Sequence, residues 1–158
     1  MSRKIRIEIT LTDTQIRDML ITAFEGGSNY WYCDADWDGC LPPGQDESPD
    51  KTPEKIPLWG GYDAPFQGGS ISLAVSDPCG ALPQWDGEQY TEVKTSEEPG
   101  SFKTRERWRV DLAALQRAAQ IMAEEHPRHF GAWVEEQWDA ETADVFLQLA
   151  CFGRIIFG

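Results

Sequence analysis

The spacing of the hydrophobic residues changes along this chain, and that change constrains the fold more than any other feature. Apolar and polar residues alternate, as in half-buried strands, over residues 3–11, 70–76, 88–95 and 102–110. In residues 16–24, and in most of the chain after residue 111, the apolar residues recur at helical spacing. Strands that come first and helices that come last, with no repeated strand–helix–strand unit, predict one α+β domain over residues 1–158 with a mostly antiparallel sheet.

Capping signals predict where the helices begin. Residues 12–15 have the S/T-x-x-E/Q form of a capping box, and apolar residues follow at helical spacing up to a glycine pair at 26–27. Asp111 and Asp139 are placed to cap two later helices, with a helical segment that begins at a proline, residues 127–137, between them. We expect the first helix and these C-terminal helices to pack on one side of a sheet of about four to six strands.

The connecting segments carry weaker signals. The glycine pair is expected to end the first helix in left-handed conformations and to lead into an aromatic strand at residues 29–33. Residues 154–157 are expected to pair as a short terminal strand. Residues 34–69 are rich in proline and glycine and have no sustained period, which predicts a long acidic loop or insertion.

The predicted loop lies in the acidic part of the chain. The formal net charge is −13, and residues 31–101 contain 14 acidic and three basic residues against 13 and 11 in the remainder. This balance argues against binding to nucleic acid or to an anionic membrane, because both attract positive charge. No apolar run approaches the ~20 residues of a membrane span. The four cysteines form no CxxC pair, so we expect reduced thiols. Together with the lack of a membrane span, this predicts a soluble cytosolic protein.

Residues 34–41 begin like a calcium-binding loop, with Asp34, Asp36 and Asp38 at alternate positions before a glycine. The match ends at position twelve, where Gln45 replaces the bidentate glutamate, so we expect a solvated acidic patch and no metal. The histidines and cysteines lack the spacing of zinc ligands, and no segment supplies a nucleophile, a base and an orienting group together. We therefore expect neither a cofactor nor an enzymatic activity.

Basic residues occupy one face of the strand predicted at residues 102–110. This basic stripe consists of Lys103, Arg105, Arg107 and Arg109. One interpretation is a binding site for a phosphorylated small molecule, in which the guanidinium groups hold phosphate while Trp31 or Trp108 stacks on a base. The other is internal pairing with the acidic loop, which we favour because the chain offers many carboxylates to any arginine.

Segments near both ends of the chain resemble a family of small uncharacterised phage and prophage proteins. Residues 25–31 match an E-G-G-x-N-Y-W segment of that family. Residues 139–148 and 152–158 match its D-A-E-T-x-D-x-F-L-Q and F-G-x-I-x-x-G segments, although Arg154 stands where the family favours an acidic residue. The resemblance implies a phage origin and, because the family has no assigned activity, it implies no catalytic residue.

Our functional hypothesis is a phage-encoded, non-enzymatic acidic protein that inhibits a host defence or nucleic-acid-handling complex in the host cytoplasm. Its acidic surface would mimic nucleic acid on a basic surface of the host protein. The residues expected to contact this partner are Asp34, Asp36, Trp37, Asp38, Asp46, Glu47 and Asp50. The alternative is a protein that binds or sequesters a small ligand, such as a nucleotide, through the basic stripe. The residues expected to bind that ligand are Trp31, Arg105, Arg107, Trp108 and Arg109.

Overall fold

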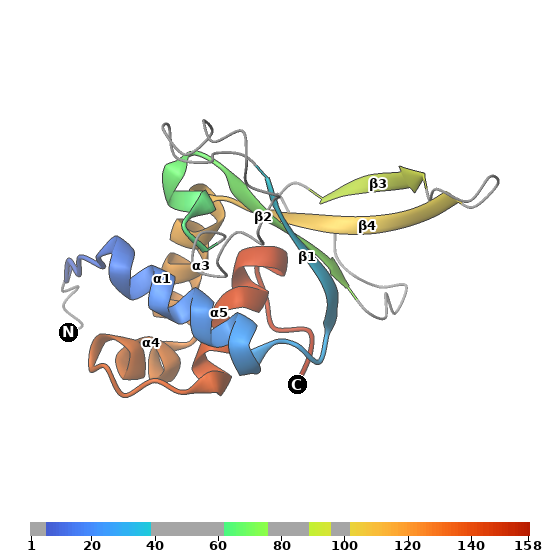
Figure 1. Cartoon of the computed structure of the whole chain (residues 1–158). Coiled ribbons are helices and arrows are strands. Elements are labelled where there is room, and N and C mark those ends of the chain that lie inside the picture. Colours follow the sequence, from blue (N-terminus) through green and yellow to red (C-terminus); the bar gives the residue numbers. More distant parts are fainter. Residues whose placement is uncertain (1–5, 39–61, 76–88, 96–101) are drawn as a thin grey trace.

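The computed structural model describes residues 6–38, 62–75, 89–95 and 102–158 of the chain. Within these residues, helices gather on one side of a four-stranded antiparallel sheet (Figure 1). Two neighbouring strands of the sheet, residues 89–95 and 102–110, extend away from the helices. The predicted α+β fold is confirmed.

The sheet contains β1 (Tyr32–Asp38), β2 (Ser70–Val75), β3 (Gln89–Thr95) and β4 (Phe102–Val110). Their order is β1-β2-β4-β3, and every neighbouring pair is antiparallel. The strands predicted at residues 70–76, 88–95 and 102–110 are confirmed as β2, β3 and β4. All the residues of β2 are buried, because this central strand is covered on both faces.

The helices are α1 (Asp13–Thr22), α3 (Leu112–Glu125), α4 (Pro127–Val134) and α5 (Ala140–Phe152). Three of them begin at the predicted caps, where the side chains of Thr12, Asp111 and Asp139 accept backbone N–H groups. The N–H of Thr142 holds the pKa of Asp139 below its ordinary value. None of the helices in the described part of the chain has the length and apolar character needed to cross a membrane.

Helix α5 is the centre of the core. Its residues from Thr142 to Phe152 are all buried, and the helix contacts α1, α3, α4 and β4. The sheet contributes buried side chains of Leu73 and Trp108 to the same core. A helix that is covered all round explains why its residues from Ala143 to Phe152 are apolar except for Asp144 and Gln148.

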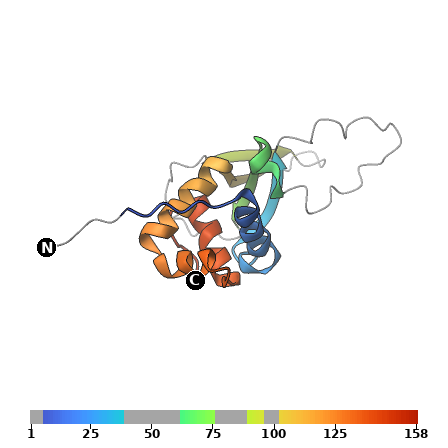
Figure 2. The ribbon, with the colours of Figure 1, turned by 90° about the vertical axis from the view of Figure 1, so that its left-hand side faces the viewer.

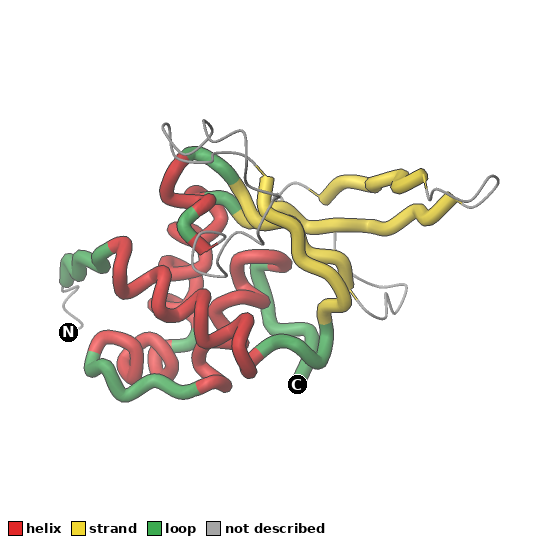
Figure 3. The backbone as a smooth tube through the Cα atoms, viewed as in Figure 1, coloured by secondary structure: helices red, strands yellow, loops and turns green. Residues whose placement is uncertain are grey.

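The strand predicted at residues 3–11 is wrong for the part that the structure describes. Residues 6–11 form no regular structure and are drawn as a loop in Figure 3. The side chains of Ile7 and Ile9 are 76% and 46% exposed, and only Leu11 packs against the core. Alternation produces a strand only when a neighbouring strand supplies hydrogen bonds, and the described residues place none beside this segment.

Two further boundaries differ from the predictions. Residues 29–31 form a turn, so the second predicted strand begins only at Tyr32, and it continues through the first five residues of the predicted loop.

A short 3-10 helix, η2 (Ala64–Gln67), lies near the end of that loop, whose residues 39–61 are outside the described ones. Residues 154–157 form no strand, and the backbone N–H groups of Ile156 and Phe157 bond to the side chain of Gln148 in α5 instead.

The glycine pair does not end the first helix in left-handed conformations. Helix α1 runs into a π-helical turn, η1 (Ala23–Gly27), and neither glycine has a positive φ. A Cβ atom on Gly27 would lie 2.7 Å from the carbonyl oxygen of Ala140. Glycine is required there because η1 packs closely on the start of α5.

This close approach predicts different effects at the two glycines. Gly27→Ala is expected to lower the free energy of unfolding by about 1–3 kcal/mol, because backbone atoms must move to admit the methyl group. Gly26→Ala is the matched control, since its Cβ atom would meet nothing within 4 Å. Urea denaturation of the two variants measures the difference, and equal stability would contradict the packing role of Gly27.

Candidate functional site

The face of the sheet opposite the helices carries a buried arginine. Along β4, Trp108 and Val110 point into the core, so Arg107 and Arg109 point to the other face. Arg107 is buried. An arginine stays charged when buried, so it needs oppositely charged partners.

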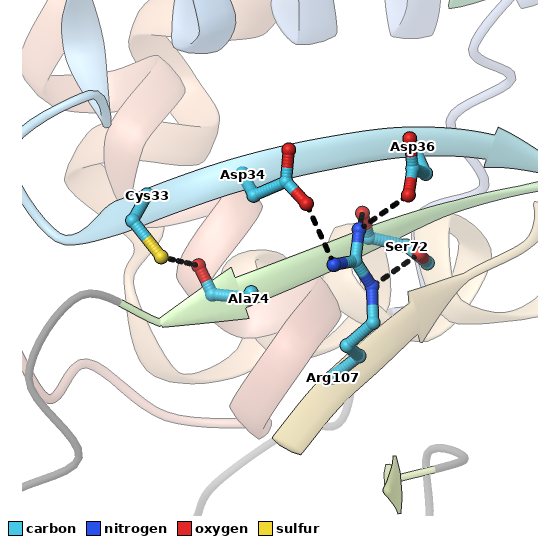
Figure 4. A network of polar contacts seen from close by, with 6 residues as sticks. All are labelled: Cys33, Asp34, Asp36, Ser72, Ala74 and Arg107. Atoms are coloured by element: carbon cyan, nitrogen blue, oxygen red, sulfur yellow. Dashed lines mark hydrogen bonds and ion pairs between the residues drawn. The ribbon is translucent and has the colours of Figure 1, made fainter. Parts of the chain in front are cut away.

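The guanidinium of Arg107 is paired with two carboxylates of β1 and is also hydrogen-bonded to a serine of β2 (Figure 4). Its Nε donates to Ser72 Oγ at 2.9 Å, and Nη2 donates to the Ser72 carbonyl oxygen at 3.3 Å. Nη1 donates to Asp34 Oδ2 at 2.8 Å, and Nη2 donates to Asp36 Oδ2 at 3.1 Å. We call these four residues the Arg107 cluster; it ties β4 to β1 across β2.

The two carboxylates of the Arg107 cluster are less buried than the arginine. The side chains of Asp34 and Asp36 are 37% and 46% exposed, against 1% for Arg107. Each carboxylate therefore meets the guanidinium on one side and water on the other. This is the internal pairing that the sequence favoured over a ligand site, observed here for Arg107.

The placement of Asp34 and Asp36 in a strand also bears on the calcium-like motif. Ligands of a calcium loop must wrap around the ion, whereas these two residues alternate along β1 and both face Arg107. Over the described ranges of the chain, no group of three or more histidine, cysteine, aspartate or glutamate side chains is placed to hold a metal.

The residues expected to stack on a nucleotide base lie in the core. Trp31 is 2% exposed and stacks on Phe157, with ring centroids 5.6 Å apart. Trp108 is 1% exposed and meets Phe152 edge-on at 5.4 Å. Neither tryptophan presents a face to solvent, so the structure does not support the interpretation as a nucleotide site.

The other residues expected to bind a ligand or a partner are only partly described. Arg109 is half-buried on β4 opposite Ser72, and Arg105 lies in the same strand with its side chain outside the described atoms. Trp37 and Asp38 end β1, and their side chains are likewise outside the description. Three predicted partner-binding residues lie outside the described part of the chain: Asp46, Glu47 and Asp50.

The sequence did not predict a second polar centre, which is built around Asp144 of α5. The carboxylate of Asp144 is buried and receives hydrogen bonds at both oxygens. Ser28 Oγ and Trp31 Nε1 each donate to Oδ1 at 2.7 Å. Tyr30 Oη donates to Oδ2 at 2.7 Å, and Gln148 Nε2 donates to Oδ2 at 2.9 Å. We call these five residues the Asp144 centre.

Gln148 extends the Asp144 centre to the C-terminal segment. Its Oε1 accepts the backbone N–H groups of Ile156 and Phe157, both at 2.8 Å. Its Nε2 also donates to the carbonyl oxygen of Phe157 at 2.9 Å. One amide side chain therefore replaces the strand partner that residues 154–157 were expected to find.

The Asp144 centre changes the acid–base chemistry of Tyr30. Burial, together with the hydrogen bond to Asp144 and its negative charge, raises the pKa of Tyr30 to about 12. The hydroxyl therefore remains a donor to Asp144 throughout the neutral range. Burial also raises the pKa of the Cys151 thiol in the same helix, which makes a reactive thiolate unfavourable there.

The three segments that carry the family resemblance meet at the Asp144 centre. Residues 25–31 supply Tyr30 and Trp31, residues 139–148 supply the acid and the amide, and residues 152–158 supply the segment that Gln148 binds. Asp144 and Gln148 are four residues apart in a helix that is otherwise apolar over its central part. That spacing places both side chains on one face and was the signal in the sequence for this centre.

Comparison of this chain with protein-family models, with curated proteins and with solved structures gave no match. Its function is therefore argued from its own residues and their geometry.

Proposed function

We propose that this chain is a phage-encoded, non-enzymatic acidic binding protein that occupies a basic surface of a host protein in the host cytoplasm. The partner we infer belongs to a defence or nucleic-acid-handling complex, on which the acidic surface takes the place of nucleic acid. The observation that carries the proposal is the concentration of 14 acidic against three basic residues within residues 31–101. No contact with nucleic acid or membrane is part of the proposal.

The Arg107 cluster supports this proposal from the structure. The side chain of Arg107 in the basic stripe lies on the face of the sheet away from the helices, and its guanidinium is buried against Asp34 and Asp36 instead of being exposed at the surface. Asp34 and Asp36 remain partly exposed at the same time. Strand β1 thus exposes part of the carboxylates of Asp34 and Asp36, and the guanidinium of Arg107 lies buried beneath them.

The Asp144 centre gives a second line of support. The hydroxyl of Ser28 and the indole N–H of Trp31 both donate to the same buried carboxylate oxygen. These contacts link the turn after η1 to α5, so their role is to hold the fold together. The family resemblance therefore concerns the scaffold, and it leaves the acidic part between the matching segments to determine the partner.

Asp34 and Asp36 are unsuitable for testing the proposal by substitution, because both pair with Arg107. Reversing Asp34 or Asp36 would leave the buried Arg107 without its counter-charge, so a loss of binding could reflect unfolding. We therefore choose Asp46→Lys, Glu47→Lys and Asp50→Lys in one variant. Capture of host proteins on the immobilised chain, with elution by salt, identifies the partner. The triple variant is expected to bind that purified partner at least about tenfold more weakly.

The control carries the same change in net charge on the helical side. It combines Asp18→Lys, Glu125→Lys and Glu135→Lys, three acids that are exposed in the structure. A salt-sensitive interaction that falls only in the loop variant supports the proposal. An interaction that is unchanged by the loop variant, or that survives high salt, contradicts it.

A further inference from the structure

After α5 the chain turns back along the molecule, and we call residues 154–158 the strap. Gly153 ends α5 in a left-handed conformation, with a φ of 68°. The strap that follows forms neither helix nor strand. In Figure 1 it runs beside the turn that leads into β1, and in Figure 2 the C mark again lies at the lower edge of the molecule. The strap is therefore a surface segment that follows the last helix.

Among the described residues, a single side chain holds the backbone of the strap. Oε1 of Gln148 accepts the N–H groups of Ile156 and Phe157, and its Nε2 donates to the carbonyl oxygen of Phe157. No backbone–backbone hydrogen bond to residues 154–158 is present in this described part of the chain. An amide that binds backbone groups recognises an extended segment through groups that every residue except proline carries.

The ring of Phe157 supplies the side-chain contact. It stacks on Trp31 with ring centroids 5.6 Å apart and an interplanar angle of 2°, and it meets Phe152 edge-on at 6.0 Å. Trp31, Gln148 and Phe152 are buried, and we call these three residues the strap site. The strap site therefore combines an amide that binds backbone with a surface for one aromatic ring, which are the two requirements for recognition of an extended peptide.

The strap is only partly buried against the strap site. Three of its five residues are exposed, and the other two, Ile156 and Phe157, are half-buried against the core. Opening of the strap would uncover Trp31 and the amide of Gln148, but it would leave the contacts of α5 with α1, α3 and α4 in place. Such an opening costs less free energy than global unfolding, because most of the core stays covered.

We propose that the strap site is a peptide-binding site which residues 156–158 occupy in the structure, and that an extended segment of another protein replaces them when the strap opens. The ligand is defined by what it replaces. It presents two successive backbone N–H groups, an aromatic side chain on the second of these residues, and a small residue after it. The strap site contains no acidic residue, so it is independent of the acidic partner surface proposed above.

A second copy of this chain is a poor source of the ligand. Its own strap already occupies its own site, so an exchange between two copies makes no new contact and still costs the entropy of association. The net charge of −13 on each copy also opposes their approach. A different protein that carries such a segment unbound has no strap of its own to release.

A fluorophore-labelled peptide with the sequence of residues 153–158 tests the strap site by fluorescence anisotropy. The full-length Phe157→Ala chain is expected to bind it at least ~10-fold more tightly than the wild-type chain, because the weakened strap competes less with the peptide. Ile155→Ala is the matched control, since it changes an exposed side chain of the strap and should bind like the wild type. A peptide with alanine in place of its phenylalanine should bind at least ~10-fold more weakly.

Equal binding of the peptide by the wild-type and Phe157→Ala chains, or no binding by a folded Phe157→Ala chain, overturns the proposal. Hydrogen exchange of the wild-type chain gives a measurement that does not depend on the folding of this variant. The amides of Ile156 and Phe157 are expected to exchange by local opening, faster than amides in the middle of α5. Exchange of these two amides only through global unfolding overturns the proposal.

Sedimentation of the wild-type chain distinguishes the source of the ligand. The chain is expected to remain monomeric at the concentrations at which the peptide binds. A wild-type dimer that Phe157→Ala abolishes would assign the strap site to a second copy, and it would overturn the assignment to another protein.

Discussion

Asp144→Ala is expected to lower the free energy of unfolding by about 3–5 kcal/mol. The alanine would leave the donors of Ser28, Trp31 and Gln148 facing a cavity that they cannot share with bulk water. Urea denaturation followed by tryptophan fluorescence measures the loss, because Trp31 reports directly on the Asp144 centre.

Two variants separate the hydrogen bonds of Asp144 from a general effect of substitution. Asp144→Asn keeps one acceptor oxygen and is expected to lose about half as much stability. It also removes the charge that helps to raise the pKa of Tyr30, so the tyrosine should titrate below its value of about 12. Asp18→Ala removes an exposed acid and should cost less than ~0.5 kcal/mol. A full-stability Asp144→Ala variant would contradict the central role of this residue.

Arg107→Met is expected to lower the free energy of unfolding by about 2–4 kcal/mol. Methionine fills most of the volume, but Asp34 and Asp36 lose the guanidinium that they share, and Ser72 loses a donor. The expected loss is smaller than at Asp144 because both carboxylates are partly exposed and can recover contact with water. Thermal unfolding and urea denaturation both measure it.

A rescue experiment tests whether the Arg107 cluster acts as a unit. Adding Asp34→Asn and Asp36→Asn to Arg107→Met removes the mutual repulsion and is expected to recover more than half of the lost stability. Arg117→Met on α3 is the control, since that arginine is exposed and should cost less than ~0.5 kcal/mol. Additive losses in the triple variant would show that the three residues contribute separately.

The sequence predicted correctly those features that depend on contacts between residues close together in the chain. The caps at Thr12, Asp111 and Asp139 are confirmed because each side chain bonds to a backbone group three residues away. Residues 6–11, by contrast, have the alternation of a strand, but no neighbouring strand lies beside them within the described residues. Alternation alone cannot show whether a second strand is present to pair with. Gly27 was assigned to a helix stop because the Ala140 carbonyl that requires the glycine is distant in sequence.

The two polar centres were predictable to different degrees. The excess of acids indicated that an arginine such as Arg107 would pair within the chain, and that pairing is observed. The sequence could not select Asp34 and Asp36, because the register between strands places them beside the guanidinium. Asp144 was missed altogether, since its donors Ser28 and Trp31 lie 116 and 113 residues away along the chain.

These long separations affect how the protein folds during synthesis. Ribosomes release the N-terminal part first, yet Ser28, Trp31 and Trp108 receive their partners in α5 only when that helix has been made. Until then α1 and the sheet expose the apolar surface that α5 covers in the folded protein. A chain in this state is prone to aggregation and to capture by chaperones. Closing contacts of such high sequence separation are also slow to form. Helix α5 therefore completes the core that the structure describes, and a nascent chain that stalls before α5 is expected to remain sensitive to proteases in α1 and the sheet.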